Sequence, residues 1–534
     1  MATKAFCPTF YDPETKIWRG AKRRPYYDPR CSVGDVIHTT LGNFPNQVIQ
    51  INIEDGTKVT CLEIRKWGVR LAMYLKKEQI TQTDIVGLIS ETNNYVVAVV
   101  VASFFNATPF HAVNVTRDAK TVQRLYEVTK PKIMFCDGFD YERIKEITKE
   151  WAPKIVLLSG RIEGVTHIED LLVPQPEENK YQPAALDKDG NQTAAILCSS
   201  GTSGLPKAVH ISHTYIARTP PLCKSTDIIL THATVDWATG FSCIVLSLFY
   251  CAPRLIFKGD YNAEKTLKII QDYEATIVAL APWQAYELFT HPLATEKSLN
   301  SVSLAFITGG WISLKVLQRA QELMKQCNIL FSYGSTETGG ITGNVDQTLN
   351  NSVGRIFPGL RVRIVNDEGT NLQHNEVGEV LIDTGFKWQG YVNNVADTES
   401  TMQDGWINLG DLGYFDDDNN LYLVDRKKDL LKYKSKHYWP NEIEQVIIEL
   451  PDVLNVCVVG VKDERHGDAA GALIIKKPGS ALTKQQVIDH VAKRVVVDYK
   501  QLNSGVQFVD ILPQNQNGKV MRSEARQLFE KNMN

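Results

Sequence analysis

Apolar and polar positions follow two different periods along the first 260 residues. Apolar residues recur at helical spacing over residues 62–76 and fill residues 95–105 almost without interruption. Residues 84–89, 109–113 and 154–159 are short apolar runs of the kind that form buried strands. Helices that alternate with such strands predict an α/β domain with a parallel sheet.

The pattern of apolar and polar positions differs at the start of the chain and over residues 354–400. Residues 1–50 are rich in Pro, Arg and Tyr and are expected to be an irregular lead-in. Residues 354–400 carry turn signals between short apolar segments, which predicts turns and short strands in a small β-barrel-like subdomain.

Length, charge and cysteine usage narrow the class of protein. A chain of 534 residues is too long for one core, so two or more domains are expected. The net charge of −3 gives no bulk attraction to nucleic acid or to an anionic membrane. Ten cysteines without a Cys-x-x-Cys pair indicate free thiols in a reducing compartment.

Targeting signals are weak along the chain. The apolar run at residues 95–105 is too short to span a bilayer and is expected to be a buried helix. The first residues lack an apolar signal core, and the last residues lack a peroxisomal Ser-Lys-Leu ending. A cytoplasmic location is therefore expected, with no integral membrane segment.

The polar segment at residues 198–208 carries the first candidate chemistry. It follows a short apolar run and contains Ser199, Ser200, Gly201, Thr202, Ser203, Gly204 and Lys207. Glycines bring backbone N–H groups close to a ligand, while hydroxyls and a lysine add further donors. The segment is therefore suited to bind an anion with several oxygens. The Walker loop is excluded, because Lys207 follows a proline.

The order of these residues resembles the phosphate-binding signature of the adenylate-forming superfamily, which holds acyl- and aryl-CoA ligases, beetle luciferases and peptide-synthetase adenylation domains. Further blocks resemble the motifs of that superfamily, in the same order. They are Tyr-Gly-Ser-Thr-Glu at residues 333–337, Asp-Gly-Trp-x-x-x-Gly-Asp at 404–411, Asp-Arg at 425–426 and Pro-x-x-x-x-Gly-Lys-x-x-Arg at 513–522.

The resemblance implies a role for each matched residue around ATP. Tyr333 would stack on adenine with its hydroxyl left in water, over a shelf formed by Gly309 and Gly310. Asp411 would accept from both ribose hydroxyls, and Glu337 would hold magnesium. The catalytic residues would be Lys207, Thr336, Arg426 and Lys519. Lys428 would be the interdomain hinge and Lys432 a further nucleotide contact.

The parts that would receive the other substrates depart from the usual pattern. The acyl pocket is expected to be bordered by Trp237, Thr239, Gly339 and Gly340, and Trp237 and Thr239 stand where the relatives have histidine and phenylalanine. The tunnel for CoA is expected to involve Lys434, Ser435 and His437. Ser435 replaces a usual glycine, which could narrow that tunnel.

Taken together, the resemblance implies an AMP-binding adenylation domain over residues 1–425 and a small mobile α+β lid domain over residues 428–534. The expected function is ATP- and magnesium-dependent activation of a small carboxylic acid to an acyl-adenylate, followed by transfer to CoA. Two other functions stay open: a luciferase-type monooxygenase that uses O2 in place of CoA, and a non-catalytic nucleotide-binding protein. Neither nucleic acid nor an obligate protein partner is expected.

Overall fold

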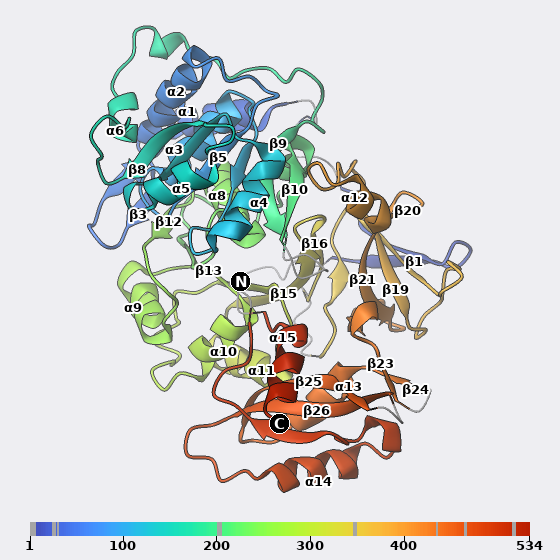
Figure 1. Cartoon of the computed structure of the whole chain (residues 1–534). Coiled ribbons are helices and arrows are strands. Elements are labelled where there is room, and N and C mark those ends of the chain that lie inside the picture. The colour runs from blue at the N-terminus through green and yellow to red at the C-terminus, as the bar shows by residue number, and fades with distance from the viewer. Residues whose placement is uncertain are drawn as a thin grey trace.

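The computed structural model describes residues 7–23, 28, 31–199, 206–344, 350–433, 436–463, 467–514 and 519–533. Within these ranges the strands form sheets of nine, six, seven and five strands. Two of the sheets are mostly parallel and carry the helices of the upper part of the molecule in Figure 1. The predicted α/β class is confirmed, with a smaller α+β unit at the C-terminal end.

The first mostly parallel sheet has nine strands. In spatial order these are β17 (Arg355–Ile356), β16 (Gly339–Gly343), β15 (Asn328–Ser335), β14 (Leu304–Thr308), β13 (Ile277–Leu280), β11 (Ile229–Thr231), β12 (Arg254–Ile256), β3 (Val48–Asn52) and β4 (Lys58–Thr60). The strands from β15 to β3 run parallel, so their carboxyl ends share one edge.

The second mostly parallel sheet has six strands. In spatial order these are β10 (Lys207–Ser212), β9 (Thr193–Ser199), β6 (Phe110–Ala112), β5 (Val86–Ile89), β7 (Ile133–Asp137) and β8 (Lys154–Ser159). Strand β10 runs antiparallel to β9, so the last residue of β9 and the first residue of β10 lie at the carboxyl edge of this sheet.

We call the part of the chain before the one-turn helix at Lys427–Asp429 the large unit. Its helices pack on these sheets and on one another. They are α1 (Val33–Asn43), α2 (Cys61–Lys77), α3 (Val96–Phe105), α4 (Ala119–Thr129), α5 (Tyr141–Ile147), α6 (Ile168–Leu171), α7 (His213–Ala217), α8 (Ala238–Tyr250), α9 (Ala263–Tyr273), α10 (Pro282–Thr290) and α11 (Leu314–Leu323). Every residue of α3 is buried, as its unbroken apolar sequence predicts. No helix of the described ranges is long and apolar enough to cross a membrane.

The prediction of an irregular segment over residues 1–50 is wrong. Two strands, β1 (Thr9–Asp12) and β2 (Ile17–Gly20), pair as a hairpin, and α1 follows them. Helix α1 buries Val33, Ile37 and Leu41 at a spacing of four residues, and the Ser32 side chain caps its N-terminus. The helical period of α1 is present in the sequence, but the region around it is rich in prolines and charged residues, which are typical of irregular segments.

The hairpin joins a third, seven-stranded sheet that corresponds to the predicted barrel-like subdomain. Its order is β1, β2, β18 (Arg361–Val365), β19 (Gly378–Asp383), β21 (Trp406–Phe415) and β20 (Met402–Gln403), with β22 (Leu421–Arg426) on β21. Trp18 of β2 stacks on Phe415 of β21 with 4.4 Å between ring centroids. The N-terminal hairpin thus helps to build the core of a subdomain that lies about 400 residues further along the chain.

The C-terminal unit has its own sheet and core. The strands are β24 (Lys436–Tyr438), β23 (Leu431–Tyr433), β26 (Gly467–Lys476), β25 (Val453–Asp463) and β27 (Gly505–Phe508), and the helices are α13 (Pro440–Ile447), α14 (Lys484–Arg494) and α15 (Arg522–Lys531). A one-turn helix at Lys427–Asp429 connects β22 to this sheet. In Figure 1 the unit lies below the large sheets, and α15 points toward them.

Candidate active site

The carboxyl edges of the two mostly parallel sheets meet in the large unit. Asn114 follows β6 of one sheet, and its side-chain amide donates to the Thr234 hydroxyl, which follows β11 of the other, at 3.1 Å. In sheets of this kind ligands bind beyond the carboxyl ends of the strands. The predicted site residues follow this rule, because Ser199, Gly309 and Glu337 all lie at or just after such strand ends.

Three residues predicted to bind the nucleoside form one network. Asp411 of β21 and Arg426 of β22 are directly opposite in the strand register, and Arg426 Nε donates to Asp411 Oδ1 at 3.2 Å. The Tyr333 hydroxyl, from β15, donates to Asp411 Oδ2 at 2.6 Å. The expectation that this hydroxyl is left in water is therefore wrong. Burial and the negative charge of Asp411 raise the pKa of Tyr333, so the phenol stays protonated and keeps donating.

Among the described residues, those predicted to bind the phosphates of ATP lie around Lys207 and do not form a network with one another. Lys207 begins β10, its side chain is only 10% exposed, and its Nζ lies 3.0 Å from Asp397 Oδ2 and 4.7 Å from the centre of the Tyr391 ring. The Ser199 hydroxyl is buried and has no hydrogen-bond partner among the described residues. Such an unpaired donor, next to a lysine, suits an anion. Ser200, Gly201, Thr202, Ser203 and Gly204 lie outside the described residues.

Glu337, the predicted magnesium ligand, is buried in the turn between β15 and β16 together with Thr336. Its Oε1 accepts from the Tyr391 hydroxyl at 2.9 Å. The described residues contain no cluster of three or more His, Cys, Asp or Glu side chains that could hold a metal by themselves. One carboxylate still fits Mg²⁺, because this ion keeps several waters and takes its other ligands from substrate phosphates.

Tyr391 and Asp397 were not foreseen from the sequence. Both lie within residues 354–400, a range predicted to hold only turns and short strands, whereas Val395–Thr401 forms helix α12, capped by the Asn394 side chain. The backbone of this segment pairs with β10: Val392 N donates to Ala208 O at 2.9 Å, and His210 N donates to Gly390 O at 3.2 Å. Only this long-range pairing brings Asp397 to Lys207, and no local pattern signals it.

Lys519 belongs to the C-terminal unit, and charges of the predicted nucleoside network act on it. Burial lowers the pKa of its ammonium to about 8, and the positive charges of Arg426 and Lys428 add to this effect while Asp411 opposes it. Asp411 and Arg426 belong to the seven-stranded sheet, so Lys519 lies near enough to the large unit for their charges to act on its ammonium. Tyr333, Asp411 and Arg426, which are far apart in the sequence, are joined directly by hydrogen bonds.

The two glycines predicted to lie under adenine follow β14. Gly309 has a φ of +103°, which a side chain would strain, and a Cβ built there would meet no atom within 4 Å. A Cβ on Gly310 would lie 3.6 Å from Pro282 Cγ. This combination leaves an open, flat stretch of backbone beside the nucleoside network, and its use as an adenine shelf stays a prediction.

The residues predicted to border the acyl pocket follow two different strands of the nine-stranded sheet, β11 and β15. Trp237 is half-buried and immediately precedes α8, where Thr239 also lies. Gly339 begins β16, and a Cβ there would lie 3.1 Å from the hydroxyl of Tyr215. A Cβ on Gly340 would lie 3.0 Å from the ring of Phe357. Tyr215 and Phe357 are thus additional candidates for the pocket wall.

The segment that links the two units contains the remaining predicted residues. Lys428 lies in the one-turn helix, and burial lowers the pKa of its ammonium. Lys432 and His437 are directly opposite on the hairpin of β23 and β24. Lys434 and Ser435 lie outside the described residues. The roles predicted for all these residues remain predictions.

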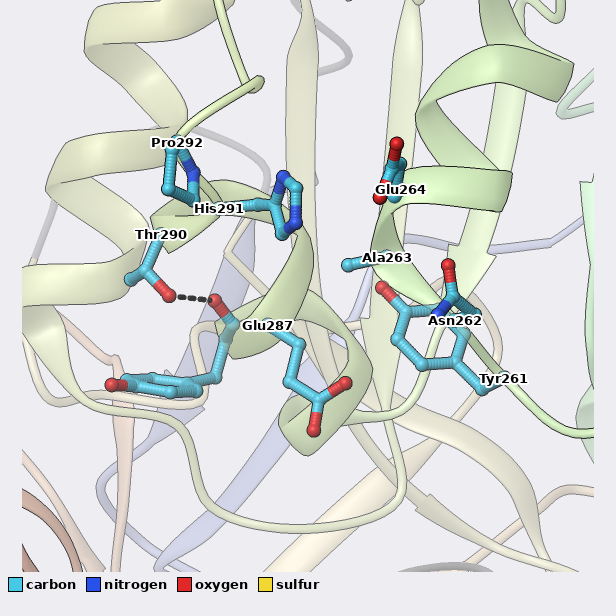
Figure 2. Close-up of a pocket in the computed structure, with 9 residues that line it drawn as sticks. Tyr261, Asn262, Ala263, Glu264, Glu287, Thr290, His291 and Pro292 are labelled. Atoms are coloured by element: carbon cyan, nitrogen blue, oxygen red, sulfur yellow. Dashed lines mark hydrogen bonds between the residues drawn. The ribbon is translucent and has the colours of Figure 1, made fainter. Parts of the chain in front are cut away.

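An open cavity of about 380 Å³ lies elsewhere, between the start of α9 and the end of α10 (Figure 2). Tyr261, Glu264, Glu287 and His291 are among its lining residues, and burial raises the pKa of Glu287. None of the predicted site residues lines it. The cavity is therefore separate from the network around Asp411.

Comparison with protein families agrees with this arrangement. The family model described as AMP-binding enzyme matches residues 37–392, and the model described as AMP-binding enzyme C-terminal domain matches residues 442–519. Because the first match covers more than half of the chain, the chain belongs to the AMP-binding enzyme family. It is an enzyme of the adenylate-forming superfamily, as the sequence motifs indicate.

Individual relatives are distant. A luciferin 4-monooxygenase of Luciola mingrelica is 27% identical over 90% of this chain and 90% of its own length. The 4-coumarate–CoA ligase 3 of Oryza sativa subsp. japonica is 26% identical over 89% of this chain and 88% of its own. ATP-bound MatB from Rhodopseudomonas palustris has a TM-score of 0.83 at 21% identity, covering 94% of this chain and 100% of that one, which shows a shared fold.

Proposed function

We propose that this protein activates a small carboxylic acid with ATP and transfers the acyl group to the thiol of CoA. The observation that carries the proposal is the hydrogen-bonded network of Tyr333, Asp411 and Arg426 in the large unit. The charges of Asp411 and Arg426 act on the ammonium of Lys519, a cation of the C-terminal unit. The names of several relatives, among them 4-coumarate–CoA ligases and an anthranilate CoA ligase, support CoA as the acceptor.

In the first step a carboxylate oxygen of the acid attacks the α-phosphorus of ATP, and the bond to the bridging oxygen of pyrophosphate breaks. Negative charge spreads over the phosphoryl oxygens as this happens. Lys207 would neutralise the β- and γ-phosphates, while Lys519 would bridge the acid and the α-phosphate. Thr336 and Arg426 would donate to the α-phosphate, so that stabilisation of charge supplies the catalysis.

Magnesium would be held by Glu337 together with the phosphates, and it would supply further neutralisation of their charge. Tyr391 donates to Glu337 Oε1 and so fixes the orientation of this carboxylate. Asp411 would accept from both ribose hydroxyls. It can do so with Tyr333 and Arg426 still bound, because each carboxylate oxygen has a second acceptor direction.

In the second step the C-terminal unit would turn about Lys428 and remove Lys519 from the site. The hairpin with Lys432, Lys434, Ser435 and His437 would then border the CoA tunnel. The thiolate sulfur of CoA would attack the acyl carbonyl carbon, and AMP would leave with the electrons of the broken carbon–oxygen bond.

A luciferase-type monooxygenase is the second candidate, favoured by a specific similarity. Luciferin 4-monooxygenases of three beetles are 25 to 27% identical to this chain over most of its length. In this alternative the same adenylation is followed by loss of a proton from the adenylate and reaction with O2. The half-buried Trp237 at the predicted acyl pocket would then shape the site for an unusual acid.

One incubation series separates the candidates. The full-length protein is incubated with ATP, magnesium and a library of carboxylic acids, with and without CoA, and with beetle luciferin in air. The proposal expects pyrophosphate release with at least one acid and an acyl-CoA thioester when CoA is added. Pyrophosphate without any thioester contradicts the ligase function, and oxygen-dependent light supports the second candidate. Tight ATP binding with no adenylate from any acid indicates a non-catalytic binding protein.

A further inference from the structure

The first helix of the C-terminal unit, α13, is held at its N-terminal end by the large unit. Asn441 is the second residue of α13, and its backbone N–H donates to Asp425 Oδ2 at 3.3 Å. The Asn441 side-chain amide donates to Val424 O at 3.0 Å. Val424 and Asp425 both belong to β22. The first N–H groups of a helix have no partner within it, so Asp425 supplies an acceptor from the other unit.

The opposite end of α13 is held by a different element of the large unit. Lys315, in the first turn of α11, donates from Nζ to Ile448 O at 3.2 Å and to Glu449 O at 2.9 Å. These carbonyls follow the last residue of α13. The last carbonyls of a helix also lack partners within it, and they carry the negative end of the helix dipole, so a lysine is favourable there.

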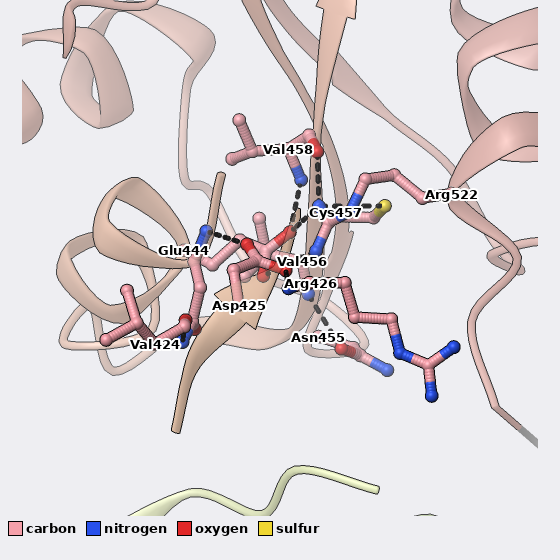
Figure 3. Close-up of polar contacts among 10 residues, drawn as sticks. Val424, Asp425, Arg426, Glu444, Asn455, Val456, Cys457, Val458 and Arg522 are labelled. Carbon is pink, nitrogen blue, oxygen red and sulfur yellow. Dashed lines mark hydrogen bonds and ion pairs between the residues drawn. The ribbon is translucent and has the colours of Figure 1, made fainter. Parts of the chain in front are cut away.

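Helix α13 is coupled in turn to the segment that carries Lys519 (Figure 3). Glu444 of α13 forms an ion pair with Arg522, and its Oε1 also accepts from Val458 N at 2.8 Å. Arg522 begins α15, three residues after Lys519, and also donates to Val458 O. The placement of α13 therefore helps to determine where the start of α15 lies, three residues after Lys519.

We propose that Lys315 and Asn441 are positioning residues for adenylation, which fix α13 at both ends and thereby hold Lys519 over the nucleotide site. This inference rests on the proposed function. Neither residue touches the reacting atoms. Each of these contacts joins a residue that precedes Lys428 in the chain to one that follows it. Rotation of the C-terminal unit about Lys428 would therefore break them. They stabilise the arrangement that serves the first half-reaction and no other.

The placement of Lys519 is measured without any activity. The full-length protein is treated at pH 7 with an amine-acylating reagent, and the rate of Lys519 modification is followed by mass spectrometry. Loss of one end contact is expected to increase this rate roughly three- to tenfold in Lys315→Ala and in Asn441→Ala, since each variant removes one of the contacts that hold the ends of α13. The double variant is expected to show a larger increase than either single one.

Two controls keep the test specific. Lys325→Ala removes another exposed lysine of the same region, whose 2.7 Å contact with Glu296 stays within the large unit, and Lys519 modification is expected to stay at the wild-type rate. Lys315→Arg keeps donors for both carbonyls and is expected to restore most of the protection. Thermal unfolding is recorded for each variant. Lys315 is exposed, so its substitution tests the proposal even where Asn441→Ala fails to fold.

The half-reactions supply a second readout. With an acid that the wild type adenylates, Lys315→Ala is expected to lower kcat for pyrophosphate exchange while thiolysis of a supplied acyl-adenylate stays equal or rises. Unchanged Lys519 modification in both Ala variants overturns the inference, and so does an equal fall in both half-reactions. Failure to adenylate any acid contradicts the proposed function instead, and it leaves the modification result to decide whether α13 places Lys519.

Discussion

The two ends of the predicted ATP site differ in what holds their charged groups before a nucleotide binds. At the nucleoside end, Asp411, Arg426 and Tyr333 hold one another, and two of them face each other on adjacent strands. At the phosphate end, Lys207 is held by Asp397, which belongs to a helix nearly 200 residues further along the chain.

This difference indicates two modes of binding. The nucleoside end is preorganised, because Asp411 can accept from ribose without losing its partners. At the phosphate end the triphosphate competes with Asp397 for the ammonium of Lys207. The hydrogen bond to Lys207 lowers the pKa of Asp397, which favours the ionised carboxylate beside the lysine. AMP lacks the β- and γ-phosphates, so comparing ATP with AMP separates the two ends experimentally.

Among substitutions at the two ends of the site, the largest effect is expected from Lys207→Ala. Loss of a cation that stabilises phosphoryl charge lowers the adenylation rate by roughly 100- to 1,000-fold, by analogy with the loss of one oxyanion donor. ATP binding, measured by calorimetry, is expected to weaken while AMP binding stays close to that of the wild type. Equal weakening of both nucleotides would contradict the assignment of Lys207 to the phosphate end.

A smaller effect, without selectivity between ATP and AMP, is expected from Asp411→Asn. Hydrogen bonds to a charged group are worth about 1.5–3 kcal/mol, so affinity is expected to fall roughly 10- to 100-fold for ATP and for AMP alike. The same titrations check this. The comparison of the two ends fails if the substitution affects ATP much more strongly than AMP.

The third prediction concerns the competition at Lys207. Asp397→Asn removes the competing charge and is expected to tighten ATP binding by roughly three- to tenfold, the range of a partly exposed ion pair and its hydrogen bond. AMP binding should not change. Thr398→Ser, at the next position of α12, serves as a control for disturbance of the helix. Weaker ATP binding in Asp397→Asn would mean that the carboxylate orients Lys207 and does not compete for it.

The sequence predicted the chemistry of both ends better than the contacts between them. Tyr333, Asp411 and Arg426 could be assigned because each lies in a recognisable block. Asp397 and Tyr391 could not, since their role depends on the pairing of residues 390–392 with β10, which no local pattern encodes. Lys315 could not be assigned either, since it is an exposed lysine of α11 whose role depends only on its contact with the end of α13.

The smallest effect is a change in pH dependence. An ordinary lysine loses its charge near pH 10.5, whereas burial lowers the pKa of Lys519 to about 8. The ammonium is charged below this value and neutral above it, so the adenylation rate is expected to fall as pH rises through about 8. In Lys519→Arg the fall should move to higher pH, because arginine stays charged. An unshifted profile in this variant would assign the titration to another group.

The central claim is that the C-terminal unit brings Lys519 to the nucleotide network for adenylation alone. It is tested most directly in Lys519→Ala, by measuring the two half-reactions separately: pyrophosphate release from ATP and acid, and hydrolysis or thiolysis of a supplied acyl-adenylate. We expect the first to be abolished and the second to stay largely intact. An equal fall in both half-reactions would contradict the claim.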